Sequence, residues 1–63
     1  MTLQDFIKNS YGIDEYDVWD GDNLYISNDI VNTIPEDVKN KKIVSFNFKT
    51  DYDEIMCSIE LEE

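Results

Sequence analysis

The stretch KIVSFNFKTDYDEIMCSIEL, residues 42–61, decides the fold because apolar and polar residues alternate in both of its halves. Such alternation is typical of a strand with one buried face. A turn centred on Asp51 and Tyr52 brings both apolar sets to the same face. The facing pairs are then Phe48–Ile55, Phe46–Cys57, Val44–Ile59 and, at the mouth of the turn, Lys49–Glu54. We therefore predict a β-hairpin over residues 42–61 that buries these apolar side chains and Leu61.

The N-terminal residues predict a helix over residues 2–11. Thr2 followed three residues later by Asp5 resembles a capping box, with Asp where Glu or Gln is usual. Apolar residues follow at helical spacing, and Gly12 is placed to end the helix in a left-handed conformation. We expect the apolar stripe, Leu3, Phe6, Ile7 and Tyr11, to lie on the sheet.

Residues 16–20 and 24–27 predict a second hairpin. A three-residue loop, Gly21-Asp22-Asn23, pairs Val18 with Ile26 and Trp19 with Tyr25. Tyr16, Val18, Leu24 and Ile26 then face the core, and Asp17, Trp19 and Tyr25 share the other face. A loop of two or four residues instead sets Trp19 against Leu24.

Residues 30–41 predict a one-turn connection. Pro35 suits the first position of a helical turn, and the acids Glu36 and Asp37 follow it near the positive end of that turn. The predicted fold is therefore α+β: a single domain, residues 1–63, with an N-terminal helix packed on a four-stranded antiparallel sheet in the order α-β-β-β-β.

The charge is unusual, since fifteen acids and five lysines give 63 residues a net charge of −10. This balance repels nucleic acid and anionic membranes and attracts cationic surfaces. A single cysteine, Cys57, suits a reducing compartment, and no signal peptide or stretch of ~20 apolar residues is visible. We expect a cytoplasmic protein, in the cytoplasm of a bacterial host.

The sequence points away from catalysis. It has no histidine and no arginine, and no glycine-rich phosphate loop. A zinc site usually needs histidines or a cluster of cysteines, and this sequence has neither. Aligning Gly21 with the glycine of an EF-hand loop puts Tyr16 and Val18 where acidic ligands belong, so that pattern fails. We predict no enzyme activity, no catalytic residue, no metal site and no cofactor.

The acidic segments predict a protein-binding surface. Carboxylates two residues apart on a strand, such as Glu15 and Asp17, are spaced by about 6.8 Å at ~3.4 Å per residue. One strand of a nucleic acid carries a charge every ~3.4 Å, which is a similar scale. Aromatic residues among acids also match interface hot spots. The predicted partner-binding residues are Asp14, Glu15, Asp17, Trp19, Asp20, Asp22, Tyr25, Asp29, Asp51, Asp53 and Glu54.

In size, charge and the acidic segments 14–17 and 51–54, the chain resembles small acidic proteins of phages and mobile elements. These are the DNA-mimic inhibitors of restriction enzymes and CRISPR effector nucleases. The resemblance rests on composition and not on a motif, so it transfers no residue role. It implies a stoichiometric inhibitor that binds the basic DNA- or RNA-binding surface of a bacterial defence nuclease, with no direct contact to nucleic acid or membrane.

Three alternatives stay open at this point. The first is an immunity protein or antitoxin that neutralises a basic toxin. The second is a small structural or regulatory protein that forms homo-oligomers, such as a homodimer joined at a sheet edge. A calcium-dependent module is the third.

Overall fold

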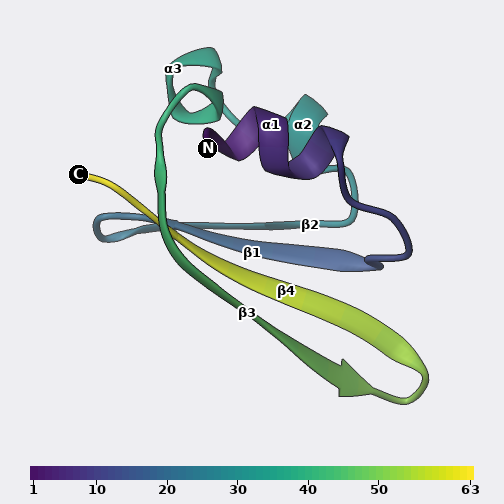
Figure 1. The fold of residues 1–63 in the computed structure, drawn as a ribbon. Helices are drawn as coiled ribbons and strands as arrows, with labels where there is room; N and C mark the ends of the chain where they lie inside the picture. The colour runs from purple at the N-terminus through teal and green to yellow at the C-terminus, as the bar shows by residue number, and fades with distance from the viewer.

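Two hairpins lie side by side in one four-stranded sheet (Figure 1). In the computed structural model, which describes residues 1–63, the first hairpin is β1 (Glu15–Asp20) with β2 (Asn23–Ser27). The second is β3 (Ile43–Asp51) with β4 (Glu54–Leu61). The strand order is β2-β1-β4-β3, and the central pair, β1 and β4, is parallel.

The α+β class with a helix first is confirmed, but the prediction of a wholly antiparallel sheet is wrong. The reason lies in the connection from β2 to β3, which crosses the sheet from one edge to the other. Because β3 thereby becomes an edge strand, the returning β4 fills the centre and runs in the same direction as β1. Local patterning within each hairpin carries no information about this pairing between hairpins.

The helices α1 (Leu3–Lys8), α2 (Ile30–Thr33) and α3 (Glu36–Lys39) all lie over one face of the sheet (Figure 1). The one-turn helix after Pro35 is confirmed as α3, whereas α2 was not predicted. None of the helices is long and apolar enough to cross a membrane.

Helix α1 begins as predicted, because the backbone N–H of Asp5 donates to Oγ1 of Thr2 at 3.2 Å. It ends earlier than predicted. The side chains of Asn9 and Ser10 donate to the carbonyls of Asp5 and Phe6, at 2.8 and 2.6 Å, and so satisfy groups that another helical turn would have used. Tyr11 consequently lies beyond the helix and is almost fully exposed instead of facing the sheet.

The 42–61 hairpin is confirmed, but its predicted register is wrong by two residues. The turn is Tyr52-Asp53, and both residues have positive φ, 50° and 66°, as a two-residue type I′ turn requires. A shift of two residues keeps the side chains from Ser45 onward on their predicted face, since side chains alternate with a period of two, whereas the irregularity before Ser45 turns Ile43 toward the core. The observed pairs are Phe48–Cys57, Phe46–Ile59, Lys49–Met56 and Asp51–Glu54, with an irregularity between Ile43 and Ser45.

Only part of this apolar face is covered. Cys57, Ile59 and Leu61 are buried as predicted, but Phe46 and Phe48 are 49% and 53% exposed. Val44 and Ile55 are exposed as well. The helices lie over the central strands, and the second hairpin extends past them (Figure 1).

The first hairpin has a two-residue turn, Gly21-Asp22, so the predicted three-residue loop is wrong. Gly21 has a φ of +61°, which glycine adopts without strain. Val18 faces Tyr25, and Trp19 faces Leu24, as the alternative loop length required. Tyr25 therefore points to the helix-covered side, and Leu24 and Ile26 share the opposite side with Trp19.

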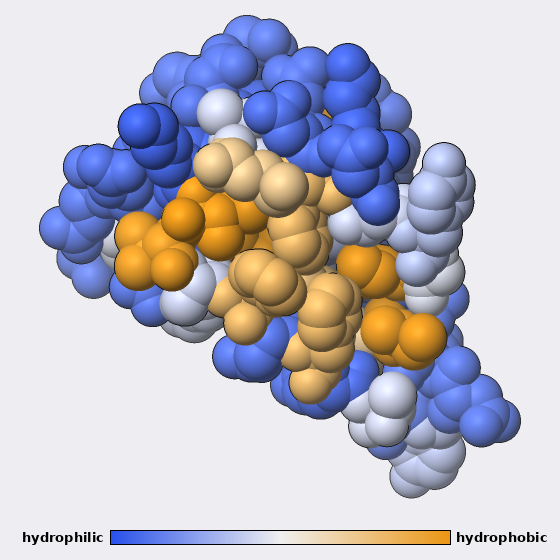
Figure 2. Space-filling model, in the orientation of Figure 1, coloured by the Kyte–Doolittle hydropathy of each residue, from blue (hydrophilic) through white to orange (hydrophobic).

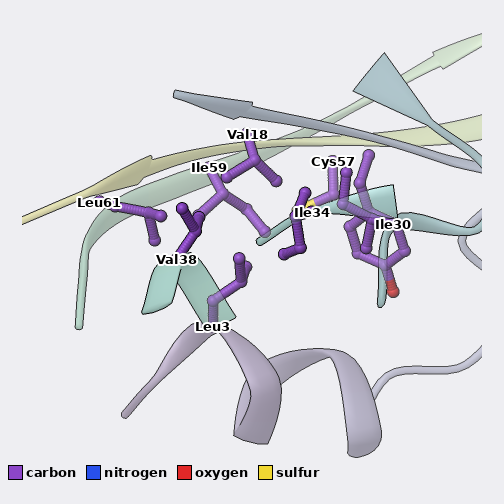
Figure 3. Close-up of a cluster of buried hydrophobic side chains, with 9 residues drawn as sticks. Leu3, Val18, Ile30, Ile34, Val38, Cys57, Ile59 and Leu61 are labelled. Carbon is purple, nitrogen blue, oxygen red and sulfur yellow. The ribbon is translucent and has the colours of Figure 1, made fainter. Parts of the chain in front are cut away.

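The core lies between the helices and the two central strands (Figure 3). The helical layer contributes a row of apolar residues at four-residue intervals, Ile30, Ile34 and Val38, together with Leu3. The strands contribute Tyr16, Val18, Cys57, Ile59 and Leu61. The segment that the sequence predicted only as a connection thus supplies a third of the nine buried residues.

Candidate protein-binding surface

The face of the sheet opposite the helices carries no covering element, and we call it the outer face (Figure 1). Its centre is built by β1 and β4, whose parallel register places Trp19 beside Glu60, Asp17 beside Ser58 and Glu15 beside Met56. Leu24 and Ile26 of β2 extend it on one side. The outer face is therefore an acidic strip with an aromatic ring and a few apolar side chains among the carboxylates.

Trp19 borders an open groove at one end of this face. The groove is lined by Trp19, Gly21, Val44, Glu60, Leu61, Glu62 and Glu63. The Trp19 side chain is 44% exposed, so part of the ring is free to contact a partner. A tryptophan face beside carboxylates suits a guanidinium or ammonium group, because the ring attracts the cation and the carboxylates accept its hydrogen bonds.

Of the predicted partner-binding residues, Glu15, Asp17 and Trp19 come together on this face. They occupy alternate positions of β1, and alternate residues of a strand point to the same side. Asp22 follows in the turn that ends β1, next to Gly21, on which an added Cβ would lie 3.7 Å from Oε1 of Glu63. The outer face thus carries two carboxylates and the indole of Trp19 on β1.

Asp20 lies apart from them, on the helix-covered side. Its carboxylate accepts a hydrogen bond from Nζ of Lys41 at 2.6 Å, and its side chain is mostly buried. This hydrogen bond raises the pKa of Lys41 above its ordinary value of 10.5. Asp20 thus joins β1 to the segment that leads into β3, and its charge is already paired within the molecule.

Two further predicted acids form hydrogen bonds within the molecule. The carboxylate of Asp14 accepts from the backbone N–H of Ile55 at 2.7 Å, while its own N–H donates to the Ile55 carbonyl at 2.8 Å. Both carboxylate oxygens of Asp29 accept from the amide of Asn32 at 3.0 Å, just before α2. These contacts fasten the ends of elements and leave the two side chains less free to meet a partner.

The remaining predicted residues lie elsewhere. Tyr25 packs beside the core on the helix-covered side. Asp51, Asp53 and Glu54 surround the turn of the second hairpin, at the end of the sheet away from the groove. The molecule is 32 Å long, so a partner that covers both ends would have to span its full length.

Glu60, Glu62 and Glu63 are additional candidates that the prediction of binding residues did not include. Their acidity is visible in the sequence, but their proximity to Trp19 depends on the parallel pairing of β1 with β4. No local signal predicts that pairing.

The buried titratable groups offer no reactive centre. Burial raises the pKa of the Cys57 thiol above its ordinary value of 9.0, and the charge of Asp17 adds to this effect. A thiol in this environment stays protonated at neutral pH and is a poor nucleophile. Burial likewise raises the pKa of Tyr16. No group of three or more acidic, cysteine or histidine side chains is arranged to hold a metal ion.

No protein-family model, curated protein or solved structure matches this chain.

Proposed function

We propose that this protein is a stoichiometric inhibitor that occupies the basic DNA- or RNA-binding surface of a bacterial defence nuclease, a CRISPR effector or a restriction enzyme. One observation carries the proposal: an uncovered sheet face presents Trp19 among carboxylates, in a chain with a net charge of −10. A basic protein in the host cytoplasm is the partner that this surface suits.

The spacing of the charges supports mimicry of a phosphate backbone. Glu15 and Asp17 repeat along β1 at about 6.8 Å, from ~3.4 Å per residue. Glu60 lies on the neighbouring strand, which in a sheet is about 4.8 Å away. Lysines and arginines that bind successive phosphates can therefore pair with these carboxylates, and the counterions they release make the binding strongly dependent on salt.

Trp19 supplies the anchor. An aromatic residue at the centre of an interface, surrounded by polar groups that exclude water, carries a large share of the binding energy. Its half-exposed ring beside Glu60 is suited to stack against an arginine of the partner. Glu62 and Glu63 extend the acidic groove past the end of the strand.

The test uses two matched variants. Asp17→Asn with Glu60→Gln removes two charges from the outer face, and Glu36→Gln with Asp37→Asn removes two charges from α3 on the other side. Both variants have the same net charge. The immobilised proteins are exposed to lysate of bacteria that express defence nucleases, and bound protein is eluted with duplex DNA and then with high salt.

We expect the unaltered protein and the α3 variant to retain a nuclease that DNA elutes, and the outer-face variant to lose it. The purified nuclease should then be inhibited at a one-to-one ratio. Equal loss in both variants would mean that only net charge matters and would contradict the assignment of the surface. A captured basic toxin that DNA does not displace would favour the immunity or antitoxin function instead.

A further inference from the structure

The long edge strand β3 lacks a partner along most of its length. It pairs with β4 on one side only. At its beginning the N-terminal segment covers the free side, because Leu3 N–H donates to the Lys41 carbonyl and Ile43 N–H to the Met1 carbonyl. From Ser45 to Asp51 no backbone hydrogen bond is formed on that side. A long bare edge of this kind is a template for another strand.

An apolar surface continues from this edge (Figure 2). The rings of Phe6 and Phe46 lie 5.0 Å apart, and those of Phe46 and Phe48 lie 5.7 Å apart. Beside them is a hollow between α1 and the second hairpin, lined by Phe6, Asn9, Ser10, Tyr11, Ile13, Phe46, Phe48, Thr50 and Ile55. None of these residues is an acid. This row of rings and the hollow form what we call the β3 patch.

The exposed rings of the β3 patch supply much of the area that a dimer requires. Phe46 and Phe48 are half exposed and Tyr11 nearly fully exposed, which leaves about 400 Å² of aromatic surface at ~200 Å² per side chain. Val44, Ile55 and the bare backbone add to it. A stable interface buries ~600–1,000 Å² on each partner, so these rings alone supply about two thirds of the lower figure.

We propose that the β3 patch binds a second copy of this chain, through antiparallel pairing of two β3 strands. The free edge runs from Ser45 to Asp51, so the pairing that uses all of it has its twofold axis at Phe48. Facing residues of antiparallel strands share one side of the sheet. Phe48 then faces Phe48, Phe46 faces Thr50, and the two apolar patches join on one side of an eight-stranded sheet.

The charge distribution favours this occupant. Two chains of −10 repel each other, so an interface between them is favoured where acids are few. Between Val38 and Thr50 there are four lysines and no acid. In the pairing centred on Phe48, Lys49 of each copy faces Asn47 of the other and Asp51 faces Ser45, so no two like charges face each other across the strands.

The first test compares Phe48→Lys with Ile26→Lys by size-exclusion chromatography with light scattering and by sedimentation, over a range of protein concentrations. Ile26 is a matched control: it is 57% exposed, close to the 53% of Phe48, but lies on the outer face of the opposite edge strand. Both substitutions reduce the net negative charge equally, but only Phe48→Lys places two lysines opposite each other at the proposed twofold axis.

We expect a dimer for the unaltered protein and for Ile26→Lys, and for Phe48→Lys a dissociation constant raised on the order of tenfold or more, as for a central aromatic anchor. A monomer at every concentration would overturn the proposal, whether or not another protein binds the β3 patch. A dimer that Phe48→Lys leaves intact would overturn it as well.

A second test reports the register and does not depend on the folding of Phe48→Lys. Two Phe48→Cys copies bring their Cβ atoms to about 5 Å, near the range of a disulfide, whereas two Thr50→Cys copies are separated by about 13 Å along the strands. We expect a disulfide-linked dimer for Phe48→Cys only, with the protein concentration raised to offset the loss of the Phe48 ring, since the native Cys57 is fully buried. Equal rates for both variants would overturn the proposed pairing.

Discussion

Replacing Ile59 by valine tests whether the small core holds this molecule together. Ile59 is buried, with Val18 and Phe46 beside it on the neighbouring strands. In Figure 3 its side chain lies among those of the core cluster. Removing one methylene from a packed core costs about 0.5–1.5 kcal/mol, because the cavity collapses only partly. A chain of 63 residues has a free energy of unfolding of roughly 3–9 kcal/mol.

The expected result is a Tm lowered by roughly 4–8 °C for a cost of about 1 kcal/mol in a domain of this size. The assay is thermal and urea unfolding followed by circular dichroism and, as a second probe, by Trp19 fluorescence. Ile26→Val is the control, since it is the same substitution on the edge strand β2 at a residue that is 57% exposed, and its cost should stay within about 0.5 kcal/mol. If the two variants lose equal stability, the assignment of the core to the central strands is wrong.

The remaining predictions concern charge and capping. Asp20→Asn should lower the urea midpoint although it reduces the net charge, because it breaks the ion pair with Lys41. Asp17→Asn, which removes the same charge without breaking an ion pair, should not lower the midpoint. Equal midpoints for the two variants would show that the ion pair contributes nothing to stability. The pKa of Cys57 in the folded protein lies above 9.0, so the stability that its protonated thiol contributes is intact below pH 9 and is lost as pH rises through the folded pKa. The urea midpoint should therefore fall between pH 8 and pH 10.5. It should fall less steeply in Cys57→Ala. Thr2→Ala should cost about 0.5–2 kcal/mol through loss of the helix cap, with rescue by Ser. Added potassium chloride should raise the midpoint of the unaltered protein, because self-repulsion at −10 is screened; a midpoint that falls with salt would contradict this.

The two proposed surfaces lie on different parts of the molecule. The outer face with Trp19 is acidic, and the β3 patch on the other side is free of acids. The Phe48→Lys substitution should therefore leave the outer face of each chain able to capture a basic partner, and Asp17→Asn with Glu60→Gln should leave dimerisation intact. A dimer would present two outer faces and could engage a partner at two sites, which strengthens binding where both can be reached at once.

Local patterns in the sequence determined the elements that depend on neighbouring residues. The alternation in residues 42–61 predicted the second hairpin, Thr2 predicted the start of α1, and Pro35 predicted α3. These features involve contacts between residues close in the chain, for which spacing and capping are sufficient information. The charge of −10 likewise follows from composition and carries most of the proposed function.

Only the tertiary structure decided the registers, the parallel pairing and the final burial. A slip of two residues preserves the alternation, so the pattern could not distinguish Phe48–Ile55 from the observed Phe48–Cys57. The turn at Tyr52-Asp53 contains no glycine that would have revealed it. Trp19 lies beside Glu60 because two hairpins distant in sequence meet in parallel, and Phe48 stays exposed because the helices end before they reach it. Such contacts depend on how far the covering layer extends, which is a property of the assembled fold and not of any single segment.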